Sequence, residues 1–440
     1  MGKPNIIFYF SDQQRWDTMG CYGQRLNVTP VLDRLASEGA LFENAFTCQP
    51  VCGPARACLQ SGLYATEVGV HTNHRILPEG MDTLARRMIA GGYETAYIGK
   101  WHLASCAGSS YRTEAVPPER RGGYEYWMVA DALEWTSHGY NGHVFDGDMN
   151  RHDFVGHRID CINAYAIDYL HKYAEGSKEK PFFLFISQLD PHHQNDHGVY
   201  EGPDGSKQRF KDFDVPGDLI GKDGDWAQNY PDYLGQCNLL DTNVGKLMDT
   251  LEALGLKDNT ILMYSSDHGS HFKTRNAEYK RSCEDACLHV PLIAWGGPFT
   301  GAGRIAAMAS LIDVPPTILD AAGLDVPAHY RGNSLLKTLH GGCNDWPDAI
   351  YAQISEAENA RTVRTKDFKY SVVTPVFNRD EPYSDVYIEE KLYDLKKDSH
   401  ENTNLIKDPA YADVRADMCK RLKEFMKHAH EPEAEILPAN

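Results

Sequence analysis

The sequence predicts an α/β fold in which helices sandwich a large mixed, mostly parallel sheet, with a small antiparallel sheet and a helix at the C-terminal end. Two observations support this prediction. Compact apolar runs at residues 5–10, 182–187 and 260–264 are typical of buried strands, and segments with helical periodicity lie between them. Strands that alternate with helices form a largely parallel sheet covered on both faces. The length of 440 residues accommodates one such domain with an appendage.

Helices and strands of the main sheet follow one another along the chain. A helix is predicted at residues 29–38, because Thr29 suits the N-cap position and Pro30 suits the first turn. The next helix, at residues 83–90, ends at two successive glycines that break the helical pattern. The other elements are a strand at 95–98 and a long amphipathic helix at 230–254.

The pattern changes after about residue 340. Short strand-like runs separated by turns are typical of an antiparallel sheet, and a final amphipathic helix follows. We therefore divide the chain into a main α/β domain, residues 1–340, and a C-terminal subdomain, residues 341–440. The C-terminal elements are expected as strands at 350–353, 360–365, 368–373 and 391–394 and a helix at 414–429.

The charge of the chain limits its partners. The formal net charge is −18, whereas nucleic acids and anionic membrane surfaces select basic faces. The sequence also has no apolar run long enough to span a membrane. We therefore expect neither nucleic acid nor a membrane as a partner, and any anionic substrate must be held by a local group of cationic side chains.

Cysteine usage and the N-terminus point to a reducing compartment. The eleven cysteines form no C-x-x-C motif and no regular framework, so zinc sites and a disulfide scaffold are not expected. The N-terminus passes from a short polar start into the first strand without a secretory signal pattern. We expect a cytoplasmic protein with reduced thiols.

Each of four predicted strands is followed by a strongly polar motif. In open α/β sheets, ligands bind outside the carboxyl ends of parallel strands. We therefore expect these motifs to converge on one site. Their central residues are Asp12, Lys100, His192 and Asp267.

The segment around Cys52 carries the most specific motif. Cys52, Pro54 and Arg56 form a Cys-x-Pro-x-Arg pattern, which Leu59 and residues 62–64 extend. A bare motif of this kind is more often a buried cysteine beside a proline turn. The extended pattern resembles the signature of the type I sulfatases of the alkaline phosphatase superfamily.

The resemblance implies a chemical role for Cys52. In type I sulfatases this cysteine is oxidised to formylglycine, an aldehyde whose hydrate carries two hydroxyls on one carbon. One hydroxyl attacks sulfur, and loss of the proton of the other expels sulfate and regenerates the aldehyde. A formylglycine-generating or radical maturase is then required as a partner. The resemblance also implies an alkaline-phosphatase-like fold, with residues 1–340 as the catalytic domain.

The resemblance further implies one divalent cation. Asp12, Asp267 and His268 match the metal ligands of the family, and the oxidised Cys52 side chain would add an oxygen. Many sulfatases have paired aspartates after the first strand, whereas here Asp12 is followed by Gln13, which would ligate through a neutral amide oxygen or drop out. We expect Ca²⁺, with Mn²⁺ as the alternative.

Other matches imply the groups that handle sulfate and protons. Lys100 would hold the nucleophile and a sulfate oxygen, and His102 would take the proton whose loss releases sulfate. His192 and Lys280 would protonate or stabilise the leaving alkoxide. Arg56 would contact the nucleophile from one helical turn away.

The residues around these motifs suggest a sulfated sugar as substrate. Polar side chains suit sugar hydroxyls, although a solvated loop network explains them equally well. We expect a sulfated monosaccharide or short glycan, while a general arylsulfatase stays open as an alternative and so does a homo-oligomeric state. The candidate substrate-binding residues are His71, Asn73, Arg75, His193 and Asn195.

Two other functions compete with this interpretation. A related branch hydrolyses phosphonate monoesters and phosphodiesters with the same Cys-x-Pro-x-Arg motif. Lys100 and His102 favour a sulfatase, because that branch has tyrosine and threonine at these positions. The second competitor is a glycan-binding protein whose Cys52 is never oxidised, but such a protein would not need the complete set of proton-transfer groups.

One histidine-rich stretch lies outside the matched motifs. Residues 138–157 contain four histidines. We interpret this stretch as a surface or rim loop and do not expect a second metal site there.

Overall fold

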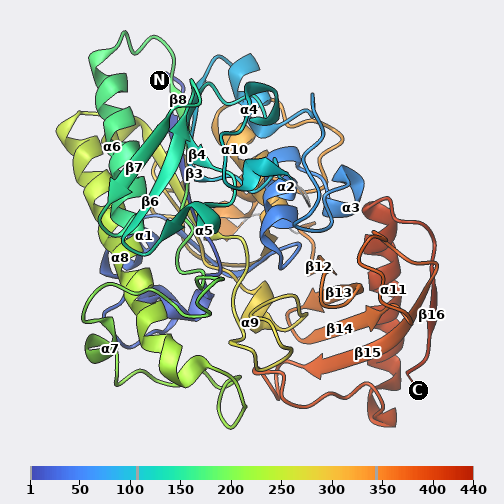
Figure 1. The fold of residues 1–440 in the computed structure, drawn as a ribbon. Coiled ribbons are helices and arrows are strands. Elements are labelled where there is room, and N and C mark those ends of the chain that lie inside the picture. Colours follow the sequence, from blue (N-terminus) through green and yellow to red (C-terminus); the bar gives the residue numbers. More distant parts are fainter. Residues whose placement is uncertain (1, 106–108, 342–344, 440) are drawn as a thin grey trace.

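The computed structural model describes residues 2–105, 109–341 and 345–439. Its centre is an 11-stranded mixed sheet with the strand order β11-β2-β10-β9-β1-β8-β3-β4-β6-β5, in which β7 also pairs with β6 (Figure 1). The five neighbours β9-β1-β8-β3-β4 are all parallel. The strands are β1 (Asn5–Ser11), β2 (Ala40–Phe46), β3 (Glu94–Lys100), β4 (Tyr126–Ala130), β5 (Ser137–His138), β6 (Asn141–Asp146), β7 (Arg151–Val155), β8 (Phe182–Ser187), β9 (Thr260–Ser266), β10 (Leu292–Trp295) and β11 (Gly303–Ser310).

Helices cover both faces of this sheet (Figure 1). Three of them pack on one face, and three others pack on the opposite face. The first group is α1 (Pro30–Glu38), α6 (Arg158–Glu175) and α8 (Trp226–Ala253); the second is α2 (Cys52–Ser61), α4 (Leu84–Ala90) and α10 (Val314–Ala321).

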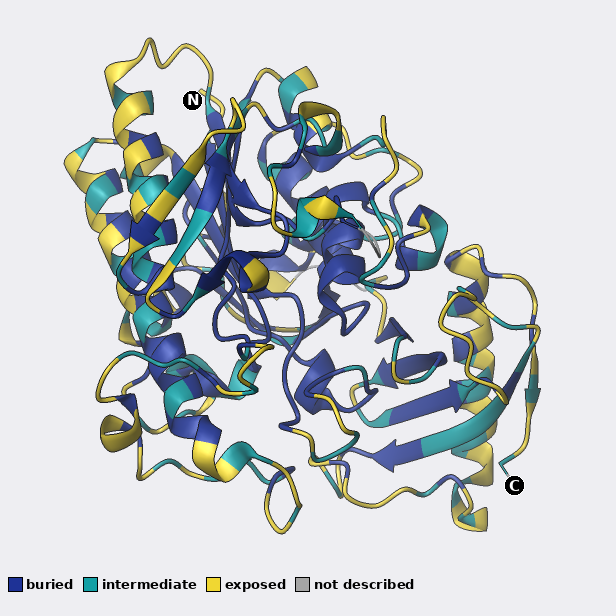
Figure 2. Ribbon diagram, in the orientation of Figure 1, coloured by how far each residue is buried: buried dark blue, intermediate teal, exposed yellow. Residues whose placement is uncertain are grey.

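The alternation of side chains along β1 explains this two-sided packing. Ile6, Phe8 and Phe10 belong to the core under α2, α4 and α10, whereas Ile7 and Tyr9 belong to the core under α1, α6 and α8. All five side chains are fully buried. Figure 2 shows the same contrast across the domain, with buried central strands and exposed outer helix faces.

The predicted elements of the main domain are present, with small shifts at their ends. The strand predicted at 182–187 coincides with β8, and α4 begins after Thr83, whose hydroxyl accepts the Arg86 N–H. Thr29 occupies the N-cap position of α1, but its hydroxyl accepts the Gly20 N–H instead of capping the helix. The carboxylate of Asp241 in α8 caps the first turn of α1.

The interpretation of residues 138–157 as a loop is wrong. β6 and β7 form an antiparallel hairpin at the edge of the main sheet. Val144, Phe145 and Phe154 of this hairpin are buried, and their burial stabilises the strands. The strands β2, β4, β10 and β11 were not predicted either, nor was α6, because their apolar runs are short or interrupted.

A second sheet of five strands, with the order β12-β13-β14-β15-β16, forms the C-terminal subdomain with α11 (Figure 1). Its pairings are antiparallel except that β16 runs parallel to β15. The four predicted strands and the helix are present, whereas β16 was not predicted. The elements are β12 (Ala349–Ile354), β13 (Ala360–Thr365), β14 (Phe368–Val373), β15 (Val386–Asp394), β16 (Glu435–Leu437) and α11 (Ala412–His428).

The core of the subdomain continues into the main domain. Tyr351 and Leu422 of the subdomain share one apolar cluster with Cys58 of α2 and with Cys48 and Tyr64, which lie before and after that helix. The predicted boundary at residue 341 adjoins residues 342–344, which lie outside the described residues, and it stays a prediction. Within the described chain, no helix has the length and apolar character needed to cross a bilayer.

Candidate active site

The polar motifs lie together at the carboxyl edge of the central strands. β9, β1, β8 and β3 are neighbours in the sheet. Asp12 directly follows β1, Asp267 directly follows β9, and Lys100 is the last residue of β3. His192 lies in the segment after β8. Since parallel strands end at the same edge, the fold brings these four side chains to one place.

Cys52 is the first residue of α2. Pro54 suits the first turn because a proline has no N–H to leave unpaired there, and Gly62 ends the helix in the left-handed region with φ 69°. All ten residues of α2 are buried. The Gly53 N–H donates to Asn73 Oδ1 at 2.8 Å, and a Cβ at Gly53 would lie only 3.0 Å from that oxygen.

The side chain of Cys52 lies among charged groups. Its Sγ accepts a hydrogen bond from Lys280 Nζ at 2.8 Å and lies 3.3 Å from His268 Nε2 and 3.5 Å from Asp12 Oδ1. Burial raises the pKa of the thiol, but the neighbouring Lys100, Lys280 and His268 outweigh burial and hold the pKa well below its ordinary value. The surroundings therefore stabilise negative charge at this position.

Asp12, Cys52, Asp267 and His268 form a buried group that fits a metal ion. Their ligand atoms all lie within 4.8 Å of one another. His268 donates its Nδ1–H to the Gly269 carbonyl at 2.9 Å, which directs the lone pair of Nε2 towards the group. Oδ2 of Asp267 is buried without a hydrogen-bond partner among the described residues.

The two carboxylates of this group differ in their pKa. Burial, and then the charge of Asp12, raise the pKa of Asp267 to about 7. Burial acts in the same direction at Asp12, but Lys100 and other nearby cations outweigh it and hold the pKa of Asp12 well below its ordinary value. A divalent cation would offset the repulsion between two buried carboxylates, so the group fits one electrostatically as well as by its ligand types.

Two permanent cations support Asp12. Lys100 Nζ donates to Asp12 Oδ2 at 2.9 Å, and Arg56 Nη2 donates to the same oxygen at 3.1 Å. Arg56 Nη1 also donates to Ser187 Oγ at 2.6 Å and to the Lys100 carbonyl at 3.0 Å. This network fixes the end of β3 and the first turns of α2 around the carboxylate.

His192 and Lys280 lie next to the Cys52 group. His192 donates its Nδ1–H to the His193 carbonyl, so its Nε2 lone pair faces Lys280 Nζ at 3.1 Å. Burial, and then the charge of Lys280, lower the pKa of His192. Lys280 Nζ therefore lies between Nε2 of His192 and Sγ of Cys52.

Backbone hydrogen bonds fix the position of His102. Its φ of 57° lies in the left-handed region, and its N–H donates to the Asp131 carbonyl at 2.7 Å. The Asp131 carboxylate accepts the N–H groups of Leu103 and Ala104. The side chain of His102 is among the groups that lower the pKa of Cys52.

Two predicted site residues make other contacts than expected. The Gln13 amide donates from Nε2 to the Tyr200 hydroxyl at 2.7 Å, and its Oε1 lies 3.3 Å from His193 Nδ1. Gln13 therefore uses its neutral oxygen on His193, while its backbone N–H donates to Asp267 Oδ1 at 3.0 Å. Asn73, expected as a substrate contact, accepts the N–H that follows Cys52.

The remaining substrate-binding candidates differ in their exposure. Arg75 is exposed and donates to the Asp380 carbonyl at 3.1 Å, and the buried ring of His71 lies beside the same segment. Asn195 is exposed in the loop after β8. These contacts tie Arg75 and His71 to the C-terminal subdomain.

Sequence reasoning missed two acidic residues at the site. Glu134 is buried, and its Oε2 lies 3.3 Å from Lys100 Nζ. Glu356 of the C-terminal subdomain accepts the Asn73 N–H at 2.7 Å and pairs with Arg281, the residue after Lys280. Glu134 could have been found from the apolar run of β4, because polar residues that follow a buried strand lie at the edge of the sheet. The local sequence around Glu356 contains no pattern that indicates a place in the site.

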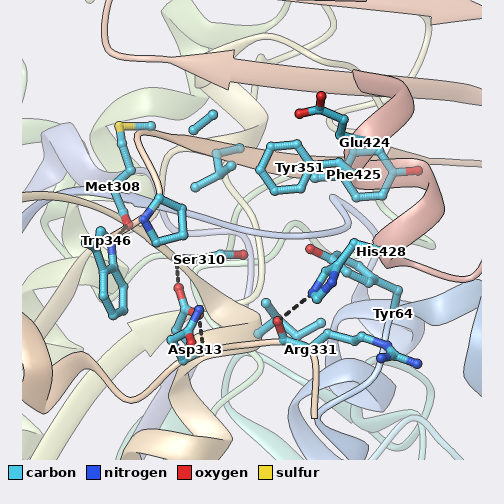
Figure 3. A pocket seen from close by; sticks show the side chains of 15 residues that line it. Tyr64, Met308, Ser310, Asp313, Arg331, Trp346, Tyr351, Glu424, Phe425 and His428 are labelled. Carbon is cyan, nitrogen blue, oxygen red and sulfur yellow. Dashed lines mark hydrogen bonds between the residues drawn. The ribbon is translucent and has the colours of Figure 1, made fainter. Parts of the chain in front are cut away.

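A separate cavity of about 290 Å³ lies at the junction with the C-terminal subdomain (Figure 3). None of the predicted catalytic residues lines it. Tyr64, Tyr351 and Phe425 supply aromatic walls, and the carboxylate of Asp313 accepts the Ser310 N–H at its floor. The cavity is therefore distinct from the Cys52 group.

A comparison with known protein families decides the identity of the fold. The family model described as Sulfatase matches residues 4–324, which is more than half of the chain. The chain belongs to the sulfatase family. A second family model, described as N-sulphoglucosamine sulphohydrolase, C-terminal, matches residues 277–428. The chain is thus a sulfuric ester hydrolase of the alkaline phosphatase superfamily, as its motifs suggested.

Individual relatives cover almost all of this sulfatase. It is 26% identical over 505 aligned residues to an N-acetylglucosamine-6-O-sulfatase from Bacteroides thetaiotaomicron, covering 97% of this chain and 86% of the relative. A solved structure described as BT4656 in complex with its substrate D-glucosamine-2-N,6-O-disulfate is 24% identical, with a TM-score of 0.78 and coverage of 97% and 98%.

The fold is also shared with an enzyme of different specificity. A phosphonate monoester hydrolase from Agrobacterium radiobacter has a TM-score of 0.74 at 22% identity, covering 97% of this chain and 96% of that structure. Together these similarities confirm the alkaline-phosphatase-like fold expected from the sequence.

Proposed function

We propose that this sulfatase hydrolyses the sulfate ester of a sugar or short glycan through a formylglycine derived from Cys52. The observation that carries the proposal is the position of Cys52 at the buried start of α2, where its Sγ touches Lys280, His268 and Asp12. The Sγ stands where an oxygen of the oxidised side chain would lie. The hydrated aldehyde would supply one hydroxyl that attacks sulfur and a second whose deprotonation lets sulfate leave.

Asp12, Asp267, His268 and the oxidised Cys52 would hold one divalent cation, which would neutralise sulfate oxygens and lower the pKa of the attacking hydroxyl. Two carboxylates favour Ca²⁺, while the imidazole keeps Mn²⁺ open. Gln13 would join this set only by giving up its contact with His193. The formylglycine requires a maturase as a partner.

Side chains of the protein would carry out the remaining steps, which are neutralisation of charge and transfer of protons. Lys100 and Lys280 neutralise the charge on a sulfate ester, because both lie within hydrogen-bond reach of Asp12 or Cys52. Neutral His192, beside Lys280, is placed to handle the proton of the leaving alcohol. His102 acts as the base that removes the second hydroxyl proton.

The names of two relatives support a sugar as the alcohol part of the sulfate ester. One bears the name N-acetylglucosamine-6-O-sulfatase, and another was solved with D-glucosamine-2-N,6-O-disulfate as its substrate. The match of the C-terminal part to the sulphoglucosamine family points the same way. A relative named arylsulfatase and the phosphonate monoester hydrolase represent the competing functions.

The deciding experiment compares substrates on protein whose Cys52 peptide shows the mass of formylglycine. Initial rates are measured with defined sulfated glucosamines and other sulfated sugars, with nitrophenyl sulfate and with a phosphodiester. We expect the highest kcat/KM on one sulfated sugar. Faster turnover of the aryl sulfate would show a general arylsulfatase, and faster turnover of the phosphodiester would overturn the proposal.

A further inference from the structure

A second group of metal-binding side chains lies at the surface, outside the Cys52 group. His138, Asp196 and His197 each offer one ligand atom, and these atoms lie within 4.8 Å of one another. Nε2 of His138 lies 2.9 Å from Asp196 Oδ2, and Nε2 of His197 lies 3.2 Å from the same oxygen. We infer that these three side chains bind a transition-metal ion such as Zn²⁺, with water in the remaining coordination positions.

The separations between the ligand atoms fit this inference. Bonds of about 2.0–2.1 Å at tetrahedral angles place neighbouring ligand atoms roughly 3.3 Å apart. The two distances to Asp196 Oδ2 lie close to that value. The rings of His138 and His197 meet edge to face at 76°, with centroids 4.9 Å apart.

Hydrogen bonds from the Gln194 side chain and from the backbone hold the ligands in place before an ion binds. The buried side chain of Gln194 donates to the carbonyls of Glu134 and Ser137 at 2.9 and 3.1 Å and so attaches the loop after β8 to β5. Within the loop, the Gln194 N–H donates to the Val199 carbonyl and the Gly198 N–H donates to the Gln194 carbonyl. These bonds bring Asp196 and His197 against His138 without help from a metal ion.

The ligand types select the class of metal. Two imidazoles and one carboxylate suit Zn²⁺, Ni²⁺ or Co²⁺ better than Ca²⁺ or Mg²⁺, which prefer oxygen ligands. The side chains of His138, Asp196 and His197 are 45%, 43% and 53% exposed, so solvent can complete the coordination and the ion can enter freely. The Cys52 group, by contrast, is buried and richer in oxygen ligands.

The surface group departs from the expectation that the histidines of residues 138–157 form no metal site. Only His138 comes from that stretch, and its partner Asp196 lies 58 residues further along the chain. The spacing of histidines in the sequence therefore could not show the site, because the other two ligands belong to a different strand connection.

An ion at this position would restrain a loop that contributes to the active site. The loop starts near His192, which contacts Lys280, and ends at Tyr200, whose hydroxyl accepts a hydrogen bond from Gln13. Binding of Zn²⁺ should therefore stabilise the folded protein by mass action and reduce the mobility of this loop. The metal site itself does not depend on the proposed substrate.

The chain offers a matched control. Nε2 of His152 lies 2.7 Å from Asp146 Oδ2 in the neighbouring hairpin, and no third ligand of the types His, Cys, Asp or Glu joins this pair among the described residues. His152→Ala therefore removes an equivalent histidine–aspartate contact without removing a three-ligand group.

The test is a Zn²⁺ titration by calorimetry on full-length protein already saturated with Ca²⁺. We expect the wild type and His152→Ala to bind one Zn²⁺ that His138→Ala and His197→Ala bind at least about tenfold more weakly. Asp196→Asn should weaken this binding too. Co²⁺ in place of Zn²⁺ should give a visible absorption band in the wild type and in His152→Ala alone.

Thermal melting separates loss of binding from loss of folding. Without Zn²⁺, all variants should melt within a few degrees of the wild type, because the substituted side chains are exposed. Zn²⁺ should raise the Tm of the wild type and His152→Ala only. Equal Zn²⁺ stoichiometry and affinity in the wild type, His138→Ala and His197→Ala would overturn the inference, as would a Zn²⁺ effect that His152→Ala abolishes.

Discussion

The Cys52 group and the His138 group use similar ligands in opposite surroundings. Asp12, Asp267 and His268 are fully buried, and burial together with a neighbouring carboxylate raises the pKa of Asp267 to about 7. His138 and Asp196 are nearly half exposed and are hydrogen-bonded to each other. Burial makes a cation necessary for the first group, whereas water can stabilise the second group without one.

The largest expected effect is at the nucleophile position of the buried group. Cys52→Ala removes the side chain that would become formylglycine in the proposed mechanism, so kcat/KM on a sulfate ester should fall by roughly 10⁴-fold or more. The melting temperature should change little, because alanine is small and suits the start of α2. The measurement is a rate comparison on purified protein with circular dichroism as the folding control. Turnover close to the wild-type level would show that another residue attacks sulfur.

The next effect is expected on the binding of the divalent ion and on the turnover that depends on it. Asp267→Asn removes one buried negative charge from the ligand group, so the bound divalent ion should be lost on dialysis and turnover should fall at least about 10²-fold. Elemental analysis after dialysis measures the loss, and the wild type should keep one ion per chain. Zn²⁺ at the exposed His138 group should dialyse away from both proteins. Retention of a stoichiometric ion by the variant would contradict the proposed ligand role.

The effect expected at His192 depends on the leaving group of the substrate. A sugar hydroxyl is a poor leaving group and needs a proton, whereas nitrophenolate leaves without one. His192→Ala should therefore reduce turnover of a sugar sulfate by about 10²–10⁴-fold and turnover of nitrophenyl sulfate much less. The two rates are measured on one preparation, which serves as its own control. Equal losses on both substrates would assign His192 to binding the sulfate group.

The last expected effect is on stability alone. It tests whether a buried carboxylate without a neighbouring cation lowers the free energy of unfolding. Burial raises the pKa of Asp313 to about 7, so the folded state prefers the protonated acid. Its contribution to the free energy of unfolding should therefore be lost as the pH rises from about 4 to 7, by up to about 4 kcal/mol. Urea unfolding of the wild type and Asp313→Asn at pH 5 and pH 8 measures this difference. A difference between the two proteins that does not change with pH would contradict the raised pKa.

The buried site could largely be predicted from the sequence, because its residues lie at the ends of strong apolar strands. Asp12 and Asp267 directly follow β1 and β9, which are fully buried and have runs of apolar or aromatic residues at their centres. The polar residue after each buried strand therefore marked the carboxyl edge, and the Cys52 motif lies at the start of the adjoining helix α2. The role of Cys52 as the precursor of the nucleophile stays a prediction.

The residues that were missed depend on contacts between distant segments. Glu356 accepts the Asn73 N–H across 283 residues of sequence, and nothing in the local pattern of either segment indicates that contact. Glu134 follows β4, a strand of five residues that was too short to be recognised. Gln13 was expected either to bind the metal through its amide oxygen or to drop out of the ligand set, and this stays a prediction. Its side chain contacts Tyr200 and His193, which come from another loop.

The burial of α2 has a consequence for the order of events during synthesis. Cys52 is 1% exposed, and every residue of its helix is buried. A maturase cannot reach a side chain in that position once the protein has folded and buried it. If Cys52 becomes formylglycine, the oxidation therefore has to precede the folding of this segment. Protein that folds before the maturase reaches it would remain a stable but permanently inactive cysteine form.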